Sequence, residues 1–332
     1  MGGDFLKDTD FLFLTSWLRA REVGMLGEEK INRMLEASGF DDAAKLLIDC
    51  GYPDMSEMSM SDIDSILETR RGDVFREIAN YDYALDVLDL FRLKFDYHNV
   101  KVLVKSRGAK TEASHLLSDC GRVGTKKLSE AFASGELGDL PTPIAATMEE
   151  ASGILARTSN PQLSDIEIDK TYYAELSALA EKLGEDFITA YVRLLIDSAN
   201  LRITIRSSRT GRSSDFLMDT LIKGGSVGID EIVSSYDEKA EPPFADGALL
   251  EAVKLGEEAM KGGAQTGFEL ACDNAVLSEV TDTQYISFGP APVVAFLAKL
   301  EWEITTVRMI LTGKINGISS DVIRERLREC HV

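Results

Sequence analysis

The sequence predicts an almost entirely α-helical fold, and two observations carry this prediction. The 332 residues contain only eight prolines, which leave long proline-free stretches at 54–140 and 162–241 where helices can run without interruption. Within these stretches apolar residues recur at helical spacing, as Leu88, Phe91 and Phe95 do, and not in the alternation typical of strands. Hydrophobic residues make up 44% of the chain, which is enough for a sizeable core.

The composition excludes several classes of partner and site. The 56 acidic residues outnumber the 36 basic ones and give a net charge of −20, so we expect no nucleic-acid partner. The four cysteines are widely separated and form no CxxC pair, and the chain has only three histidines. We therefore expect neither a zinc site nor a disulfide framework, as is usual in a reducing cytoplasm, and no cofactor.

Membrane-spanning and targeting segments are also not expected. The longest uncharged run, 283–298, has 16 residues and is interrupted by Gly289, Pro290 and Pro292, so it is unsuited to crossing a bilayer. The first residues are acidic ahead of their apolar stretch and lack a small-residue cleavage site, unlike a secretory signal. We expect a cytoplasmic location.

Gly- and Pro-rich breaks near 134–143 and 239–247 are the best candidates for domain edges. They divide the chain into a first helical repeat with N-terminal helices at 1–138, a second repeat at 139–242 and a third at 243–332.

One pattern occurs three times, and it supports this division. It consists of a basic residue, an acid four positions later, a small polar residue at +7, an apolar residue at +8 and a basic residue at +9. The three copies are Arg92, Asp96, Asn99, Val100 and Lys101; Arg193, Asp197, Asn200, Leu201 and Arg202; and Lys299, Glu303, Thr306, Val307 and Arg308.

On a helix, offsets 0, +4 and +7 lie within about 60° of one another and form one polar stripe, while +9 points to the other side. In one interpretation the first two residues form an ordinary i,i+4 surface pair that contributes about 0.2–0.5 kcal/mol. In the other, the charged residues form a partly buried network that fixes interdomain or partner geometry. The nine charged residues of the pattern are therefore our candidate partner-binding or interdomain residues. Basic residues also cluster around the three copies, which would suit an acidic partner or reflect repeated folding constraints.

At this point the sequence resembles a known family, the C subunit of prokaryotic V-type (archaeal-type) ATPases, whose eukaryotic counterpart is the d subunit of the vacuolar proton pump. The resemblance covers most of the chain. Its clearest block is Phe288-Gly-Pro-Ala-Pro-Val-Val-Ala-Phe-Leu-Ala-Lys299, followed by Val307-Arg-Met-Ile-Leu-Thr-Gly-Lys314 and Ile323-Arg-Glu-Arg-Leu-Arg328. The first two repeats are similar to the family's Asp-x-x-Asn-apolar-basic signature, and the third lacks both Asp and Asn.

This resemblance implies three similar all-helical domains arranged with pseudo-threefold symmetry as a funnel. It also implies a subunit that is not an enzyme. One face would seat the rotor shaft subunits of the ATPase and the other would stand on the membrane proteolipid ring, on the cytoplasmic side of the membrane.

Other motifs suggest competing functions. Residues 224–228 match the GxSxG pattern of serine hydrolases around Ser226, but the preceding segment is predicted to be helical and the equivalent turn at 121–124 has Arg122 at this position. A helix–helix turn is the better interpretation. The chain contains no GxxxxGK[ST] phosphate-binding motif. The partial match at Thr312-Gly-Lys314 lacks the upstream glycine that this motif needs, so we expect no ATP binding.

Two further features are better explained by a role in folding than by metal or ligand binding. The acidic run of Asp165, Glu167 and Asp169 lacks the glycine and terminal glutamate of an EF-hand and fits a helix N-terminus. His98 has Ala and Thr at the equivalent positions, as expected for a packed residue and not for a ligand. The remaining alternatives to a rotary-ATPase subunit are a helical repeat scaffold for another protein partner and a hydrolase that uses Ser226.

Overall fold

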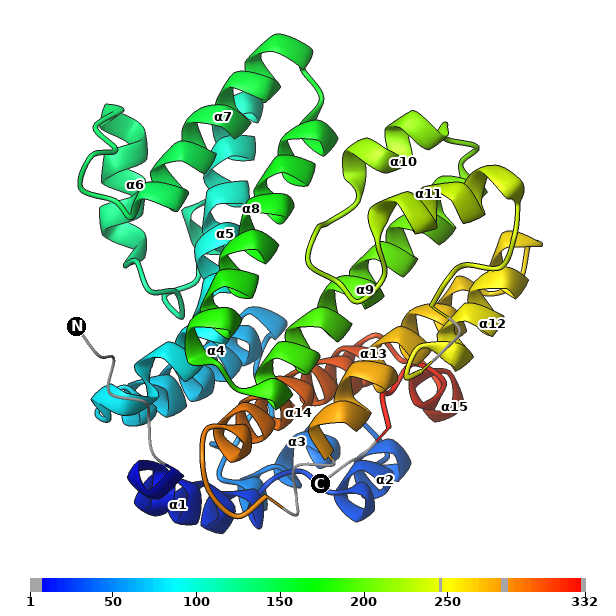
Figure 1. Ribbon diagram of the computed structural model, residues 1–332. Helices are drawn as coiled ribbons and strands as arrows, with labels where there is room; N and C mark the ends of the chain where they lie inside the picture. Colours follow the sequence, from blue (N-terminus) through cyan, green and yellow to red (C-terminus); the bar gives the residue numbers. More distant parts are fainter. Residues whose placement is uncertain (1–7, 245–246, 282–285, 330–332) are drawn as a thin grey trace.

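The computed structural model describes residues 8–244, 247–281 and 286–329, and within these ranges the chain is helical and contains no β-strand (Figure 1). The all-α prediction is confirmed. Local sequence explains several helix starts. Ser59 and Asp62 form a reciprocal capping box before α4, and Asn160 caps α8 directly ahead of Pro161.

The helices differ widely in length, and the repeated pattern lies on three of the longest, α5, α9 and α14. In chain order the helices are α1 (Leu12–Glu22), α2 (Glu28–Glu36), α3 (Phe40–Lys45), α4 (Met60–Ile78), α5 (Leu85–Ala109), α6 (Thr125–Ser134), α7 (Thr142–Thr158), α8 (Pro161–Leu183), α9 (Asp186–Arg209), α10 (Ser214–Thr220), α11 (Ile229–Glu238), α12 (Leu250–Met260), α13 (Gln265–Thr281), α14 (Ala291–Ile315) and α15 (Ser320–Arg324).

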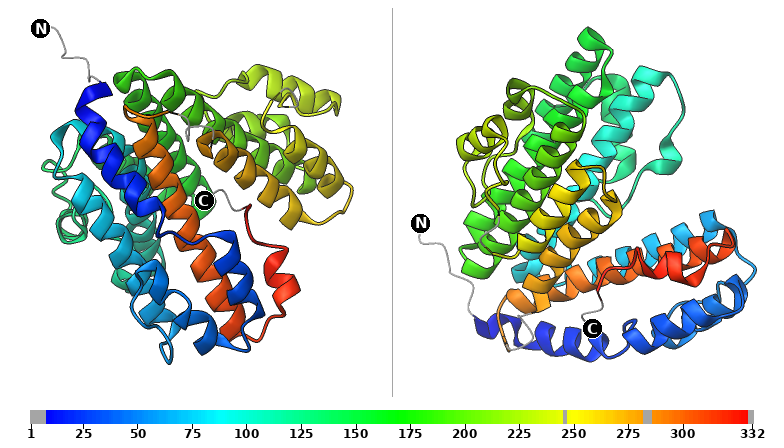
Figure 2. Two further views of the ribbon diagram at one scale, coloured as in Figure 1. Left: turned by 90° about the horizontal axis from the view of Figure 1, so that it is seen from below. Right: turned by 90° about the vertical axis from the view of Figure 1, so that its right-hand side faces the viewer.

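The helices pack in three groups, each built around one of these long helices (Figure 1). Helix α5 packs with α7 and α8, helix α9 packs with α12 and α13, and helix α14 packs with α1, α3 and α4. The third group therefore joins the N-terminal helix α1 to the late helix α14, and these two helices lie side by side in both views of Figure 2. The domain boundaries after residues 138 and 242 stay a prediction.

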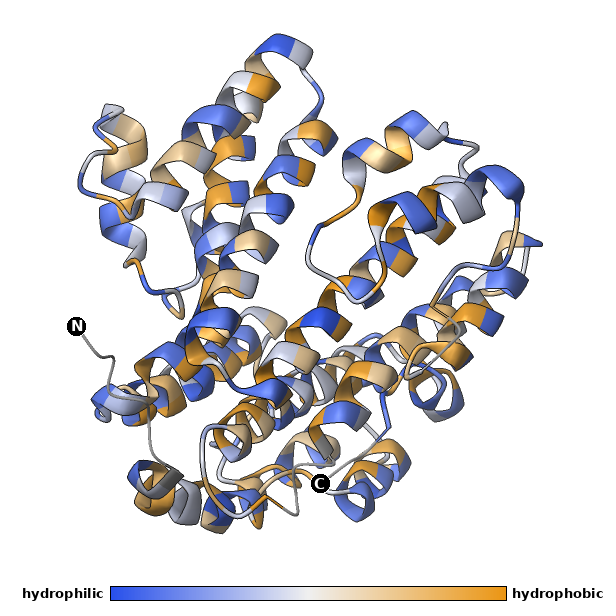
Figure 3. Ribbon diagram, viewed as in Figure 1, coloured by the Kyte–Doolittle hydropathy of each residue, from blue (hydrophilic) through white to orange (hydrophobic). Residues whose placement is uncertain are grey.

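The hydrophobic core runs through all three groups, and a second cluster surrounds the C-terminal half of α9. Figure 3 shows polar and apolar residues mixed along most helices, as expected when one face of each helix is buried. Helix α14 is buried along nearly its whole length and contacts helices of every group. No helix among the described residues combines the length and the apolar character that crossing a membrane requires.

Candidate functional site

Three buried carboxylates occupy the same position on the three long helices. Asp96 on α5, Asp197 on α9 and Glu303 on α14 are the acids of the repeated pattern, and they are 0%, 4% and 0% exposed. A charge in the interior is stable only when hydrogen bonds or opposite charges compensate for the lost water. Each of the three accepts hydrogen bonds from the backbone of a four-residue loop with glycine at both ends, so we call them the loop carboxylates.

The first loop carboxylate is neutralised by an arginine of the loop that it binds. Asp96 accepts a hydrogen bond from the backbone N–H of Val123 (3.0 Å) and another from Nε of Arg122 (2.8 Å). The same guanidinium donates to Oε1 of Glu175 on α8 at 2.9 Å. Burial raises the pKa of the Asp96 carboxyl, and the hydrogen bonds from Arg122 and Val123 act against this rise. Loop 121–124 is thus fixed to α5 and α8 together.

The second loop carboxylate performs the same task with neutral donors. Both oxygens of Asp197 accept from the backbone N–H of Ser226 (3.0 Å), one also accepts from that of Val227 (3.4 Å), and the Ser226 hydroxyl donates as well. Within the described part of the chain, Asp197 forms no ion pair. Ser226 therefore stands where the first repeat has Arg122, and it supplies a hydrogen bond without a charge.

The third loop carboxylate binds a loop from the other end of the sequence. Oε2 of Glu303 accepts from the backbone N–H of Leu26 at 2.7 Å, in the loop at 24–27. Its other oxygen accepts from the Tyr52 hydroxyl (2.8 Å) and from the Arg70 guanidinium (2.8 Å to Nη2). Glu303 is thus paired with a cation, as Asp96 is, although the cation comes from α4.

The first glycine of two of these loops is required by the close approach of the carboxylate. A Cβ atom on Gly121 would lie 2.4 Å from Oδ1 of Asp96, and one on Gly225 would lie 2.1 Å from Oδ1 of Asp197. Real side chains do not approach so closely, so any larger residue would displace the carboxylate. The last glycine of each loop directly precedes a helix, which is α6, α11 or α2.

The small polar residue of the pattern binds the segment just before the loop. Asn99 donates from Nδ2 to the Ser118 carbonyl (2.8 Å) and accepts from the Ser118 N–H (2.8 Å). Asn200 makes the same two hydrogen bonds with Ile222, at 2.8 and 2.9 Å. Thr306 occupies this position in the third copy and is also buried. The acid and the amide therefore act together to hold one connection against each of the first two long helices.

The interpretation that the first two residues of the pattern form an i,i+4 ion pair is wrong. Arg92 donates to the Gly121 carbonyl at 2.8 Å, Lys299 pairs with Glu22 at 3.4 Å, and Arg193 is exposed. The carboxylates point to their loops, so the basic residue one turn earlier is left to bind elsewhere. The partner-binding role predicted for these residues is untested and stays a prediction.

The basic residues at +9 connect each long helix to a neighbouring helix of its own group. Each pairs with one or two carboxylates on α8, α13 or α4. The pairs are Lys101 with Asp169 (2.5 Å), Arg202 with Glu269 (2.7 Å) and Asp273 (2.6 Å), and Arg308 with Asp64 (2.9 Å). In the acidic run at 165–169, Asp165 also pairs with Lys105 at 2.6 Å.

Comparison with known proteins agrees with the repeated pattern. A family model described as ATP synthase (C/AC39) subunit matches residues 14–326. The chain belongs to this family. It is 22% identical over 330 residues to the C subunit of the V-type sodium ATPase of Enterococcus hirae, covering 96% of this chain and 98% of that protein. It is 23% identical to the C subunits of the A-type ATP synthases of Methanocaldococcus jannaschii and Thermococcus kodakarensis, covering 96% and 97% of this chain and 86% and 92% of theirs.

In this member of the C/AC39 family Ser226 has a structural role. The serine lies in a connection between helices α10 and α11, and its hydroxyl donates to a buried carboxylate. A hydrolase would need the serine on a strand-to-helix turn beside a histidine base, and the described residues contain no strand. Nε2 of His98 lies 2.9 Å from the carbonyl oxygen of Leu116, in the connection between α5 and α6.

A second charged cluster connects the groups to one another. Glu301 on α14 binds Nε of Arg71 on α4 (2.6 Å) and Nζ of Lys94 on α5 (2.7 Å). Burial opposes its ionisation, but the two cations lower the pKa of the Glu301 carboxyl below its usual value. Glu301 is therefore charged at neutral pH and fixes α14 against α4 and α5.

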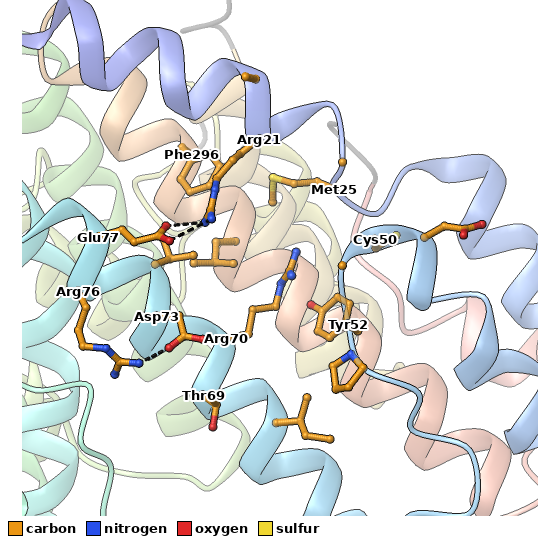
Figure 4. Close-up of a pocket in the computed structure, with 18 of the residues that line it drawn as sticks. Arg21, Met25, Cys50, Tyr52, Thr69, Arg70, Asp73, Arg76, Glu77 and Phe296 are labelled. Atoms are coloured by element: carbon orange, nitrogen blue, oxygen red, sulfur yellow. Dashed lines mark hydrogen bonds and ion pairs between the residues drawn. The ribbon is translucent and has the colours of Figure 1, made fainter.

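A cavity of about 880 Å³ lies beside the third loop carboxylate (Figure 4). Figure 4 shows Arg70 beside Tyr52, and the guanidinium carbon lies 4.1 Å from the centre of the Tyr52 ring. The other two arginines of its lining are also paired with acids, Arg21 with Glu77 and Arg76 with Asp73. The cavity thus carries no unpaired arginine with which to hold an anion.

Sequence reasoning missed the loop at 24–27. Its signal was present, because Gly24-Met-Leu-Gly27 has the same glycine spacing as 121–124 and 225–228. Each first glycine is also followed, seven positions later, by an apolar residue that is buried, namely Ile31, Leu128 and Ile232.

Proposed function

We propose that this chain is a non-catalytic coupling subunit of a V-type or A-type rotary ATPase. In this role it seats the rotor shaft on one face and stands on the proteolipid ring with the other, at the cytoplasmic face of the membrane. Support comes from family membership over residues 14–326 and from relatives named as the C subunits of a sodium ATPase and of ATP synthases.

The observation that carries the proposal is the threefold use of a buried carboxylate to fix a loop against a long helix. We infer from it three similar helical domains, arranged with pseudo-threefold symmetry as a funnel around the long helices. Ion pairs at +9 stiffen each domain, and the Glu301 cluster fixes α14 to helices of the other groups. Such a body would pass a torque from one face to the other without deforming.

A structural role also agrees with how the chain uses its polar residues. The serine of the GxSxG motif and the acids of the repeated pattern are bound to backbone and side-chain donors. These groups hold the fold together and are not available to a substrate.

Removal of the subunit from the assembled complex tests the proposal. We expect the soluble head to keep ATP hydrolysis while ATP-driven ion transport across the membrane is lost. Both activities are measured on the same preparation, and re-addition of the purified chain should restore transport. Loss of hydrolysis by the head alone would contradict a purely coupling role.

A sedimentation assay tests the membrane side. The purified chain should sediment with liposomes that carry the proteolipid ring and stay in solution with protein-free anionic liposomes at physiological salt, since a net charge of −20 disfavours anionic lipid. Strong sedimentation with bare liposomes would indicate a lipid-binding protein instead.

A further inference from the structure

A lysine amine and a buried thiol lie in direct contact near the start of the chain. Nζ of Lys30, on α2, donates to Sγ of Cys50 at 3.2 Å and to the carbonyl oxygen of Asp49 at 3.3 Å. Cys50 ends a short 3₁₀ helix (Ile48–Cys50), so the contact joins two elements that are distant in the sequence. Because the lysine side chain is flexible, only a small movement separates this contact from a covalent bond between nitrogen and sulfur.

The other two cysteines of the described structure lack such a neighbour. Cys120 and Cys272 are buried, as Cys50 is, but neither thiol has a lysine amine as a hydrogen-bond partner among the described residues. The thiol of Cys120 lies 3.8 Å from the carbonyl oxygen of Glu68 instead. The contact between thiol and amine is therefore particular to Cys50 and does not follow from burial of a cysteine.

A small oxidant can reach Cys50 although this residue is only 5% exposed. Cys50 belongs to the lining of the cavity of about 880 Å³ beside Glu303, and Figure 4 shows it among the side chains around this cavity. Such a cavity has room for water, and hydrogen peroxide is little larger. Burial raises the pKa of the Cys50 thiol and Glu303 adds to this rise, whereas the Lys30 and Arg70 cations oppose it. The reactive thiolate is a minor species at neutral pH, so oxidation requires sustained exposure to peroxide.

We propose that hydrogen peroxide converts this contact into a covalent sulfenamide bridge between Lys30 and Cys50. The thiolate of Cys50 attacks one peroxide oxygen, the O–O bond breaks, and the products are a sulfenic acid and hydroxide. The hydroxide takes a proton from the Lys30 ammonium and becomes water. The free amine then attacks the sulfur, the S–O bond breaks, and a second water leaves as the S–N bond forms. Sulfur is oxidised and peroxide is reduced, so thiolate, ammonium and hydrogen peroxide give the bridge and two waters.

The bridge ties together the two segments that bind the third loop carboxylate. Lys30 follows the loop at 24–27, whose backbone donates to Glu303, and Cys50 shortly precedes Tyr52, whose hydroxyl donates to the other oxygen of the same carboxylate. A cross-link between these segments restricts the unfolded chain and so stabilises the folded third group. Because thiols reduce an S–N bond, the bridge acts as a reversible lock that depends on oxidant. This modification goes beyond the coupling role and does not depend on it.

Peptide mapping of the purified chain tests the proposal. The chain is treated with hydrogen peroxide, its free thiols are blocked, and it is digested with trypsin. We expect peptide 22–33 joined to peptide 46–70, because trypsin does not cleave after a modified Lys30. Apart from oxygens added to methionines, the joined species should weigh two hydrogen atoms less than the two peptides together, and dithiothreitol should separate it. Thermal unfolding should show a rise in Tm of about 3–6 °C that dithiothreitol reverses.

Two variants serve as controls. Lys30→Arg keeps the positive charge but replaces the amine by a guanidinium that stays protonated, and Cys50→Ser removes the sulfur. After the same treatment neither variant should give the joined peptide or a rise in Tm that dithiothreitol reverses. A parent chain in which Cys50 stays reduced, or is oxidised to sulfinic or sulfonic acid without any joined peptide, would overturn the proposal. This decisive result is obtained on the parent chain and does not depend on how well either variant folds.

Discussion

The first and second repeats solve one structural problem with different chemistry. Each must hold a glycine-flanked loop against a long helix, and each uses a buried aspartate at the same helical position. Asp96 pairs with the Arg122 guanidinium, whereas Asp197 is held by the backbone and hydroxyl of Ser226 and the backbone of Val227. The position of the aspartate relative to its loop is the same in both repeats, but the groups that compensate its negative charge differ.

Comparison of the two sites separates the residues that both loops require from the arginine that only the first repeat has. Both repeats share the aspartate, the asparagine and the first glycine of the loop, so these residues make the connection itself. Arg122 brings a second acid, Glu175 on α8, into the cluster and thereby couples the loop to another helix. The loop of the first repeat is held by a charged network, and the loop of the second is held by hydrogen bonds alone.

Loss of the arginine should produce the largest effect. Arg122→Met leaves Asp96 and Glu175 without their cation, so we expect a loss of about 2–4 kcal/mol in the free energy of unfolding. This is below the value for a fully buried pair because Arg122 is 20% exposed. Chemical denaturation measures it. Arg193→Met, at an exposed residue of the second repeat, is the control and should change stability by less than about 0.5 kcal/mol. Equal losses in the two variants would erase the distinction between the repeats.

Substitution of the shared glycine should affect both repeats alike. Gly121→Ala and Gly225→Ala each force a methyl group against a buried carboxylate, and we expect each to cost about 1–3 kcal/mol of stability. Gly138→Ala, where a Cβ would meet nothing within 4 Å, serves as the control in the same denaturation experiment. A harmless Gly225→Ala would mean that Asp197 can move away, and the connection would then be softer in the second repeat.

Removal of the serine hydroxyl should have a smaller effect. Ser226→Ala takes one donor from Asp197 but leaves the backbone donors in place, and water reaches the exposed Ser226 position. We expect a loss of about 1 kcal/mol, the net contribution of a typical hydrogen bond, because water can replace the lost donor. Thermal unfolding at two salt concentrations should give the same difference, because no ion pair is broken. A strong dependence on salt would reveal a cation near Asp197 in solution.

Transfer of the arginine to the second repeat should have the smallest effect. Ser226→Arg places a guanidinium where Arg122 stands, and a partly exposed pair of this kind contributes about 0–1 kcal/mol. We expect stability close to that of the parent chain, with a new sensitivity to salt. A loss of several kcal/mol would show that the second loop cannot accept the first repeat's solution.

The sequence predicted the helices and the position of the buried acids because both depend on periodicity. Offsets of four and seven residues place Asp96 and Asn99 on one side of a helix whatever that helix packs against. The partner of the acid could not be found in this way. Its donors come from a loop 26 or more residues later, and the local spacing favoured the arginine one turn away instead.

The loop that binds the acid of the third repeat was missed for a different reason. A search for a loop downstream of Glu303 finds none, because the equivalent loop at 24–27 precedes its helix in the sequence. Only the packing of α14 against the N-terminal helices brings the two together.

The hydrogen bond between Leu26 and Glu303 also sets an order of events during synthesis. Its two residues are 277 positions apart, whereas Val123 and Asp96 are separated by 27. At roughly 5–20 residues per second, the ribosome needs on the order of tens of seconds to supply the acceptor for Leu26. The first two repeats can close while the chain is still growing. The N-terminal loop must wait for nearly the whole chain, so the group that is begun first is the last to be completed.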